Sequence, residues 1–212
     1  MPRNTKPLPE DATLDMVRKY CQKFVDKEEF ALGERVVKKV FAQYPDNTSF
    51  DSIMIKSCVL NTIAHTKIYA IDKVASRIFP LKIDHRIISG DKTLVNEIAQ
   101  VRINEKSHRN FYSFASKYCH FHNPVYPIYD SFVEEMLVHY QIKSPFMVLS
   151  QGMNPKTKTH IRKHLEDYGH FSDTLEAFKN KYGLQNCSTE EIDHFLWIYG
   201  HELYDKKSEH FS

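Results

Sequence analysis

A chain of 212 residues with 42% hydrophobic and 26% charged residues can bury a core as one soluble domain or as two small lobes. Its formal charge of +2 is close to neutral, so any nucleic-acid binding has to come from a local basic patch. Six glycines are too few for tight-turned β architecture, and the sequence contains no glycine-rich loop of the P-loop or Rossmann kind.

Cysteine spacing and apolar run length indicate the compartment. The four cysteines are scattered without a C-x-x-C pair, which is typical of reduced thiols and unlike an iron–sulfur or zinc site. No stretch reaches the roughly 20 apolar residues of a membrane-spanning helix, and the N-terminal sequence lacks an apolar signal core. We therefore expect a cytoplasmic protein with no membrane partner, no metal and no cofactor.

The N-terminal half shows mainly helical periodicity. Residues 1–10 contain three prolines and are predicted to form a flexible tail. One helical domain is predicted over 11–212, and it can consist of two lobes with a cleft between them. Apolar spacing predicts helix over 14–44, and Thr48 or Ser49 can cap the next helix. That helix, from Ser49 to His65, is apolar on so many sides that we expect it to be central and buried.

The pattern continues with a helix from Ile68 to Phe79, which Pro80 ends, and a short helix within 89–102. The segment from 107 to 122 has an apolar and a polar face. The apolar face holds Phe111, Phe114, Ala115, Tyr118, Cys119 and His122, and the polar face holds Asn110, Ser113, Lys117 and His120.

Prolines and a capping signal mark the next boundary. Pro124 and Pro127 end the preceding helix, and Ser131 with Glu134 predicts a capping box for a helix that continues to about Tyr140. Further helices are predicted near 157–168, 174–181 and 189–204. The sequence shows no internal repeat and no run of alternating strands, so the predicted class is all-α.

A buried helix, a proline-rich turn and an aspartate before a capped helix follow one another in "FASKYCHFHNPVYPIYDSFVEEML". This order resembles the helix-hairpin-helix DNA glycosylase superfamily, and "PVYPIYDSFV" is similar to the segment that carries its catalytic aspartate. "SIMIKSCVLNTIAHT" and "KIYAIDKVASRIF" are similar to the early pair of helices, whose connecting turn enters DNA and lines the base pocket. The resemblance covers roughly residues 50–140 and implies a compact two-lobed helical fold with Asp130 as the catalytic carboxylate.

Two features of the superfamily are not matched. Its hairpin contains a G-h-G turn, whereas this chain has no glycine between Asp91 and Phe121. Lyase members such as endonuclease III carry a nucleophilic lysine about eighteen residues before the aspartate, where this chain has Tyr112 and Ser113. Lys117 lies one helical turn later. The resemblance therefore implies a monofunctional enzyme that hydrolyses the N-glycosidic bond and leaves an abasic site.

The resemblance also suggests which residues border the base or bind DNA. These candidates are Asn61, His65, Arg109, Ser113, Lys117, His120, Tyr126 and Tyr129. Their simpler roles remain open: an aspartate before a helix is often only a cap, Asn61 and His65 can end a helix, and tyrosines commonly pack in cores.

Basic side chains gather where the glycine hairpin would lie. Arg102, Lys106, Arg109 and Lys117 are accompanied by a single acid, Glu105, and basic side chains can replace backbone amides as phosphate contacts. A second basic segment, "KTKTHIRKH" over 156–164, fits a solvated helix face equally well.

These observations lead to one hypothesis and two alternatives. The hypothesis is a DNA glycosylase-like enzyme for a damaged or modified base, with antiviral defence against a hypermodified phage base as a suggested role. The alternatives are a non-catalytic DNA-binding protein on the same scaffold and an all-α protein-interaction module. We expect a monomer with DNA as its partner.

Overall fold

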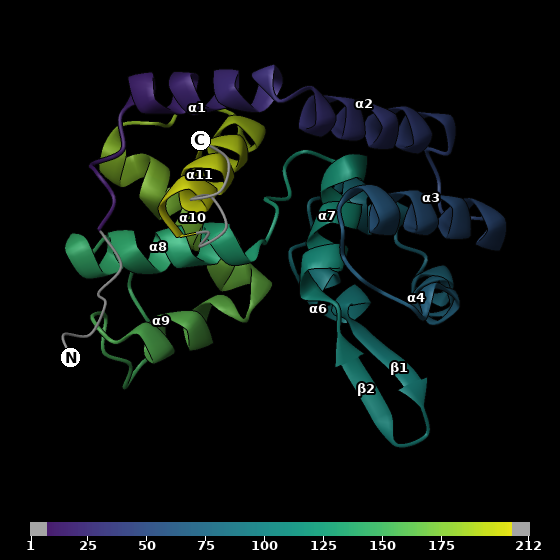
Figure 1. Cartoon of the computed structure of the whole chain (residues 1–212). Helices are drawn as coiled ribbons and strands as arrows, with labels where there is room; N and C mark the ends of the chain where they lie inside the picture. Colours follow the sequence, from purple (N-terminus) through teal and green to yellow (C-terminus); the bar gives the residue numbers. More distant parts are fainter. Residues whose placement is uncertain (1–7, 205–212) are drawn as a thin grey trace, which may run out of the picture. The chain divides into compact units, whose positions relative to one another are not determined.

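The computed structural model describes residues 8–204, so most of the predicted N-terminal tail lies outside the described residues. The chain divides into two compact units. The terminal unit contains the residues up to Asp26 and those from Asp130 onward, and the central unit contains Lys27–Tyr129. The chain therefore returns to the terminal unit at Asp130, and most described residues are helical, as predicted (Figure 1).

The terminal unit is built around two packed helices, α8 and α11. Its elements are α1 (Leu14–Asp26), α8 (Ser131–Lys143), α9 (Lys158–Leu165), α10 (Tyr168–Tyr182) and α11 (Thr189–Tyr204). Gly200 allows the close approach of α11 to α8, because an added Cβ would lie 3.1 Å from the Phe132 carbonyl oxygen and from Met136. On another side of α11, the rings of Tyr20 and Tyr199 stack at 4.9 Å and hold α1 in place.

The central unit places helix α3 against three other helices. Its elements are α2 (Glu28–Gln43), α3 (Phe50–Ile63), α4 (Ile71–Ile78), the short helix η1 (Phe79–Leu81), α5 (Asp84–Ile88), α6 (Thr93–Ala99), β1 (Gln100–Asn104), β2 (Ser107–Asn110) and α7 (Tyr112–His122). Helix α3 contacts α2, α4 and α7, and its Ile53 and Leu60 are fully buried. The helix is thus central, as predicted, but it is buried on one side only, since Phe50 and Ile55 are exposed.

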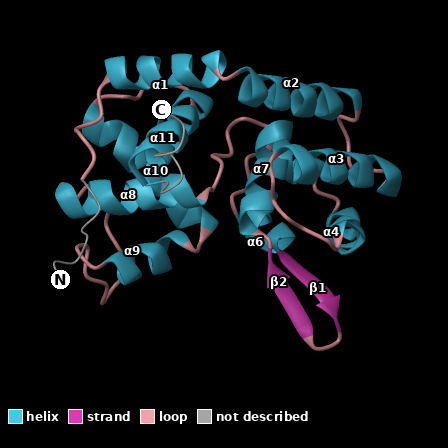
Figure 2. Ribbon diagram, viewed as in Figure 1, coloured by secondary structure: helices cyan, strands magenta, loops and turns pink. Residues whose placement is uncertain are grey.

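A short β-hairpin was not predicted. Residues 100–104 pair antiparallel with 107–110, and Figure 2 shows the two strands projecting from the helices of the central unit. Val101 is buried while its neighbours are exposed, and the Asn104 side chain accepts a hydrogen bond from Lys106 N at 2.9 Å, which closes the turn. Helical prediction over 100–102 and 107–110 was therefore wrong, because nonlocal pairing and one buried valine decide this segment.

Other helix boundaries moved by a few residues. Helix α4 begins at Ile71 instead of Ile68, α10 begins earlier than predicted at Tyr168, and α5 was not predicted. Asp167 explains the α10 start, since its side chain accepts a hydrogen bond from His170 N at 3.0 Å. Within residues 8–204, no helix combines the length and the hydrophobicity that crossing a bilayer requires.

Candidate functional site

Asp130 is the N-cap of helix α8. Its backbone is extended, its side chain is half-buried, and Oδ1 accepts a hydrogen bond from Phe132 N at 2.9 Å. The predicted capping box at Ser131 and Glu134 is therefore wrong: Ser131 is already the first helical residue, and a cap must precede it with non-helical backbone. Glu134 instead faces Arg162, with 4.0 Å between Oε1 and Nε.

The segment that leads to Asp130 is anchored on helix α7. Ser116 Oγ accepts a hydrogen bond from Tyr129 N at 3.0 Å, and His120 Nδ1 lies 2.7 Å from the Tyr126 carbonyl oxygen, to which a protonated Nδ1 donates. Ser116 and His120 are one helical turn apart and both are buried. Two buried side chains thus fix the backbone immediately before the candidate aspartate.

His120 and Tyr126 are core residues. His120 was predicted on the polar face of its helix, but it is only 3% exposed. Tyr126 is 1% exposed, and its hydroxyl lies within hydrogen-bond distance of the Arg86 carbonyl oxygen, at 3.0 Å. The structure does not support a direct contact of either ring with a base, because neither ring has an accessible face.

Tyr129 keeps part of its surface exposed and is the better candidate for a base contact. Its ring lies 4.2 Å from that of Tyr112, tilted by 33°. This packing fixes the tyrosine directly before Asp130 without burying it completely.

Ser113 and Lys117 lie together on α7. Lys117 Nζ donates a hydrogen bond to Ser113 Oγ at 2.9 Å, and both side chains are half-buried. The lysine that sequence comparison placed one turn away from the lyase position is thus held by the preceding turn of its own helix. Both residues belong to the central unit, whereas Asp130 is the first residue of the returning terminal unit.

The hairpin displays basic side chains on both of its faces. Arg102, Lys106, His108 and Arg109 are all exposed on β1, the turn and β2. Arg102 is the register partner of His108, and Arg109 is the partner of buried Val101. Of the four basic residues predicted here, Arg102, Lys106 and Arg109 thus lie on a projecting two-stranded element (Figure 2), whereas Lys117 lies on α7 and is half-buried.

The second basic segment is largely used inside the terminal unit. Arg162 forms an ion pair with buried Glu135, and Lys163 Nζ lies 2.6 Å from a Glu166 oxygen. Lys158 Nζ lies 2.7 Å from His139 Nε2. Lys158, Arg162 and Lys163 are exposed, as on the solvated helix face that the sequence left open, and their charged ends are bound within the terminal unit.

Asn61 organises the connection between α3 and α4. Its Oδ1 accepts hydrogen bonds from the Thr66 hydroxyl at 2.7 Å and from Ile68 N at 2.9 Å, and its Nδ2 donates to the Ile68 carbonyl at 3.0 Å. His65 is exposed with a left-handed backbone, φ 49°. Asn61 therefore shapes the loop, whereas His65 is presented by it.

A buried polar network in the central unit was missed. Lys56 is fully buried, and its Nζ donates to the Asp46 carbonyl at 2.6 Å and to Asn47 Oδ1 at 2.9 Å. His122 Nε2 lies 3.2 Å from the same ammonium, and the Tyr118 hydroxyl donates to Asn47 Oδ1 at 2.6 Å. A lysine inside the apolar run "SIMIKSCVL" was the sequence signal for this network.

Burial controls protonation in this network. Desolvation lowers the pKa of Lys56 to about 8, against the opposing effect of the Asp84 and Asp46 carboxylates. Desolvation, together with the Lys56 charge, lowers the pKa of His122 to about 3. At neutral pH a charged lysine thus donates to a neutral imidazole, and the network ties α3 to α7.

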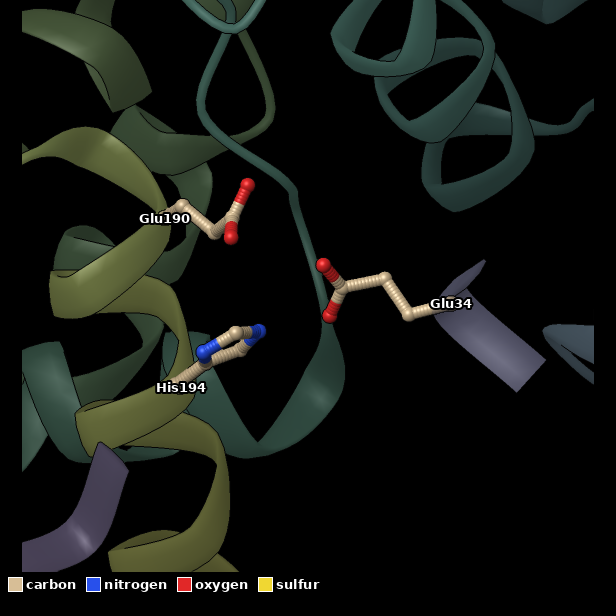
Figure 3. A group of neighbouring side chains, drawn as sticks. All are labelled: Glu34, Glu190 and His194. Atoms are coloured by element: carbon tan, nitrogen blue, oxygen red, sulfur yellow. The ribbon is translucent and has the colours of Figure 1, made fainter. Parts of the chain in front are cut away.

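Figure 3 shows a carboxylate and an imidazole on helix α11, Glu190 and His194, together with Glu34 of α2. Glu190 and His194 are one helical turn apart in the terminal unit, and the His194 ring stacks on Phe24 with centroids 3.7 Å apart. Glu34 belongs to the central unit. Two ligands from one helix are fewer than the three or four of a protein zinc site, so the absence of a bound metal stays a prediction.

Comparison with known proteins matches residues 16–126 to the family HI_0787_N, described as an N-terminal domain. A Haemophilus influenzae protein, named an uncharacterized protein, is 35% identical to this chain over 185 residues. The aligned part covers 85% of this chain and 82% of that protein. No solved structure matches the chain. The family match spans α1 and nearly all of the central unit, and it ends shortly before Asp130.

Proposed function

The chain belongs to the HI_0787_N family, and we propose that it is a DNA-binding enzyme that hydrolyses the N-glycosidic bond of a damaged or modified base. The observation that carries this proposal is the fixed position of Asp130. Its carboxylate is oriented by Phe132 N and remains half-buried, and the backbone before it is anchored by Ser116 and His120.

A single oriented carboxylate suits this reaction. Breaking the base–sugar bond builds positive charge on the deoxyribose, as in other glycoside cleavages. An ionised aspartate beneath the sugar can stabilise that cation and orient the attacking water, and a fixed side chain does so without reorganising during the reaction. The base has to leave the duplex first, and the ring of Tyr129 next to Asp130 can contact it.

The exposed basic hairpin supports DNA as the substrate. Arg102, Lys106 and Arg109 project from the helices, where they can neutralise phosphates on the DNA backbone. Lys117 is hydrogen-bonded to Ser113, and we propose no covalent step through it. The product is then an abasic site in an intact strand.

The test is an isosteric substitution that keeps the cap. Asparagine caps helices about as well as aspartate does, so Asp130→Asn should retain the bond to Phe132 N while it removes the charge. The matched control is Asp167→Asn, which makes the same change at the N-cap of α10. Alkali-labile sites are measured on DNA panels with damaged bases and with hypermodified phage bases.

We expect wild type and Asp167→Asn to create abasic sites, and Asp130→Asn to lose about 10²- to 10⁴-fold in rate at unchanged thermal stability. Equal activity of the two variants would refute the role of Asp130.

A non-catalytic DNA-binding protein is the second candidate, and the cap role of Asp130 favours it. Binding that weakens steeply with salt, without abasic product on any DNA of the panel, would support this candidate.

A further inference from the structure

Two of the four cysteines, Cys21 and Cys187, lie in one neighbourhood of the terminal unit. Cys21 belongs to α1, and its thiol donates a hydrogen bond to the Glu191 carbonyl oxygen in the first turn of α11, with 3.4 Å from Sγ to oxygen. Cys187 comes two residues before the start of α11, so it precedes Glu191 by about one helical turn. Two thiols that are far apart in the sequence are therefore both placed at the beginning of the same helix.

The start of α11 is well defined next to Cys187. Ser188 N donates to Glu191 Oε2 at 2.7 Å, and Ser188 Oγ accepts from Glu191 N at 3.1 Å, so the two residues form a capping box. Cys187 itself precedes the helix, and its N–H donates to the Leu184 carbonyl oxygen at 2.9 Å. Its thiol is thus buried on a loop, where the backbone can adjust more easily than inside a helix.

Charges on α1 act on the Cys187 thiol. Burial raises the pKa of Cys187, and the charges of Glu191 and Cys21 raise it further. The positive charges of Lys179 and Arg18 act in the opposite direction. Side-chain charges have such effects at close range, and Arg18 and Cys21 are one turn apart on α1. Cys187 therefore lies next to the face of α1 that carries Cys21.

We propose that Cys21 and Cys187 form a reversible disulfide that joins α1 to the start of α11 under oxidising conditions. The half-buried Cys21 reacts first: its thiolate attacks one sulfur of a low-molecular-weight disulfide such as oxidised glutathione, and one reduced glutathione leaves. The Cys187 thiolate then attacks the Cys21 sulfur of this mixed disulfide, and a second reduced glutathione leaves. The two leaving thiolates take up the two protons, so two protein thiols are oxidised and one glutathione disulfide is reduced.

The other two cysteines are unsuited to the same reaction. Cys58 and Cys119 both belong to the central unit. Cys119 is fully buried, and burial raises the pKa of its thiol, whereas only a thiolate attacks a disulfide. Cys58 is exposed, but the only other cysteine of its unit is the buried Cys119. Cys58 is therefore expected to stop at the mixed disulfide with glutathione.

The disulfide closes a covalent loop that contains the whole central unit, because Lys27–Tyr129 lies between the two cysteines in the chain. Closing a long loop removes conformational freedom from the unfolded chain and so stabilises the folded one. The raised pKa of Cys187 also makes the second step faster at alkaline pH, where more of this thiol is ionised.

The test incubates the reduced 212-residue chain with oxidised glutathione, alkylates the remaining thiols and maps the peptides by mass spectrometry. We expect a pair of peptides joined through Cys21 and Cys187, and a glutathione adduct at Cys58. Cys58→Ser is the matched control and should keep the joined pair, whereas Cys21→Ser and Cys187→Ser should lose it. Oxidised wild type should unfold at a temperature roughly 5–15 °C above that of reduced wild type, and Cys187→Ser should show no such shift.

A glutathione adduct at Cys21 without a link to Cys187 would overturn the inference, because the two sulfurs are then too far apart. A link between two copies of the chain through Cys58, with Cys21 and Cys187 still reduced, would overturn it as well. The peptide map of the wild type decides between these outcomes even where a serine variant fails to fold. None of the measurements involves DNA or abasic product, so the inference and the proposed function fail separately.

Discussion

Replacing Lys56 by methionine should change how the stability of the central unit depends on pH. The lysine is fully buried, and desolvation lowers its pKa from 10.5 to about 8. In the unfolded chain the amine keeps its proton up to about pH 10.5, whereas the folded chain releases it near pH 8. The unfolded state therefore binds more protons between these values, and the free energy of unfolding rises with pH across this window.

The pKa difference sets the size of the effect. Lowering the Lys56 pKa from 10.5 to about 8 means that folding favours the neutral amine over the charged ammonium by about 3 kcal/mol. Most of it appears inside the window, so we expect about 2 kcal/mol between about pH 7 and about pH 9.5. Below about pH 7 the lysine is charged in both states, and its contribution no longer changes.

Urea unfolding followed by far-ultraviolet circular dichroism measures this effect in both variants. Tyrosines, cysteines and other lysines also titrate at high pH, but they are common to both chains and cancel in the difference. Lys56→Met keeps a side chain of similar length without a titrating group. We expect wild type to gain about 2 kcal/mol relative to Lys56→Met between the two pH values. Parallel curves of unfolding free energy against pH for the two chains would refute the assignment of the lowered pKa to buried Lys56.

Three further substitutions probe the loops and the hairpin. Ser116→Ala should lower the turnover rate by about 10- to 100-fold with DNA affinity retained, because the backbone before Asp130 loses an anchor. In an Asp130→Asn background it should cost nothing more, and additive losses would contradict this positioning role. Arg109→Ala should reduce the slope of log DNA affinity against log salt concentration by about one. Lys163→Ala removes a lysine that is paired with Glu166 of its own helix turn, and it should leave the slope unchanged. Equal slopes for the two variants would exclude the hairpin as a DNA contact. Asn61→Ala should lower the free energy of unfolding by about 1–3 kcal/mol in urea titrations, since Ile68 loses both backbone partners, and an unchanged midpoint would show that the loop is not held by Asn61.

Helices were the predictable part of this fold because their signal is local. The apolar residues of α3 predicted a buried helix, and Ile53 and Leu60 are buried, but apolar character alone did not show that Phe50 and Ile55 are exposed. The β-hairpin has the opposite character, since five-residue and four-residue strands carry little periodic signal. Strand β1, which holds buried Val101, packs against α4 as well as against its neighbour α6, and a single valine in a charged segment does not show this.

The predicted site residues show the same difference between local signals, which the sequence carries, and nonlocal contacts, which it does not. Arg109 and His65 are exposed, and their charge or ring was evident from residue type. His120 was placed on the wrong face because helical periodicity does not show that a proline-rich segment folds back and covers a polar stripe. The Tyr126 carbonyl on that segment then satisfies the imidazole, so a histidine that looked solvated is buried.

Asp130 shows why a cap and a catalytic group are not alternatives. The sequence predicts a capping box at Ser131 and Glu134, but Asp130 itself accepts the bond from Phe132 N. A carboxylate has about four acceptor positions, so one bond to a backbone amide does not exhaust its capacity to meet a water or a sugar cation. The same bond restricts rotation of the side chain, and a charge that is already oriented stabilises a developing cation most effectively. The cap is therefore a means of positioning, and a comparison of Asp130→Asn with Asp167→Asn isolates the charge from the cap.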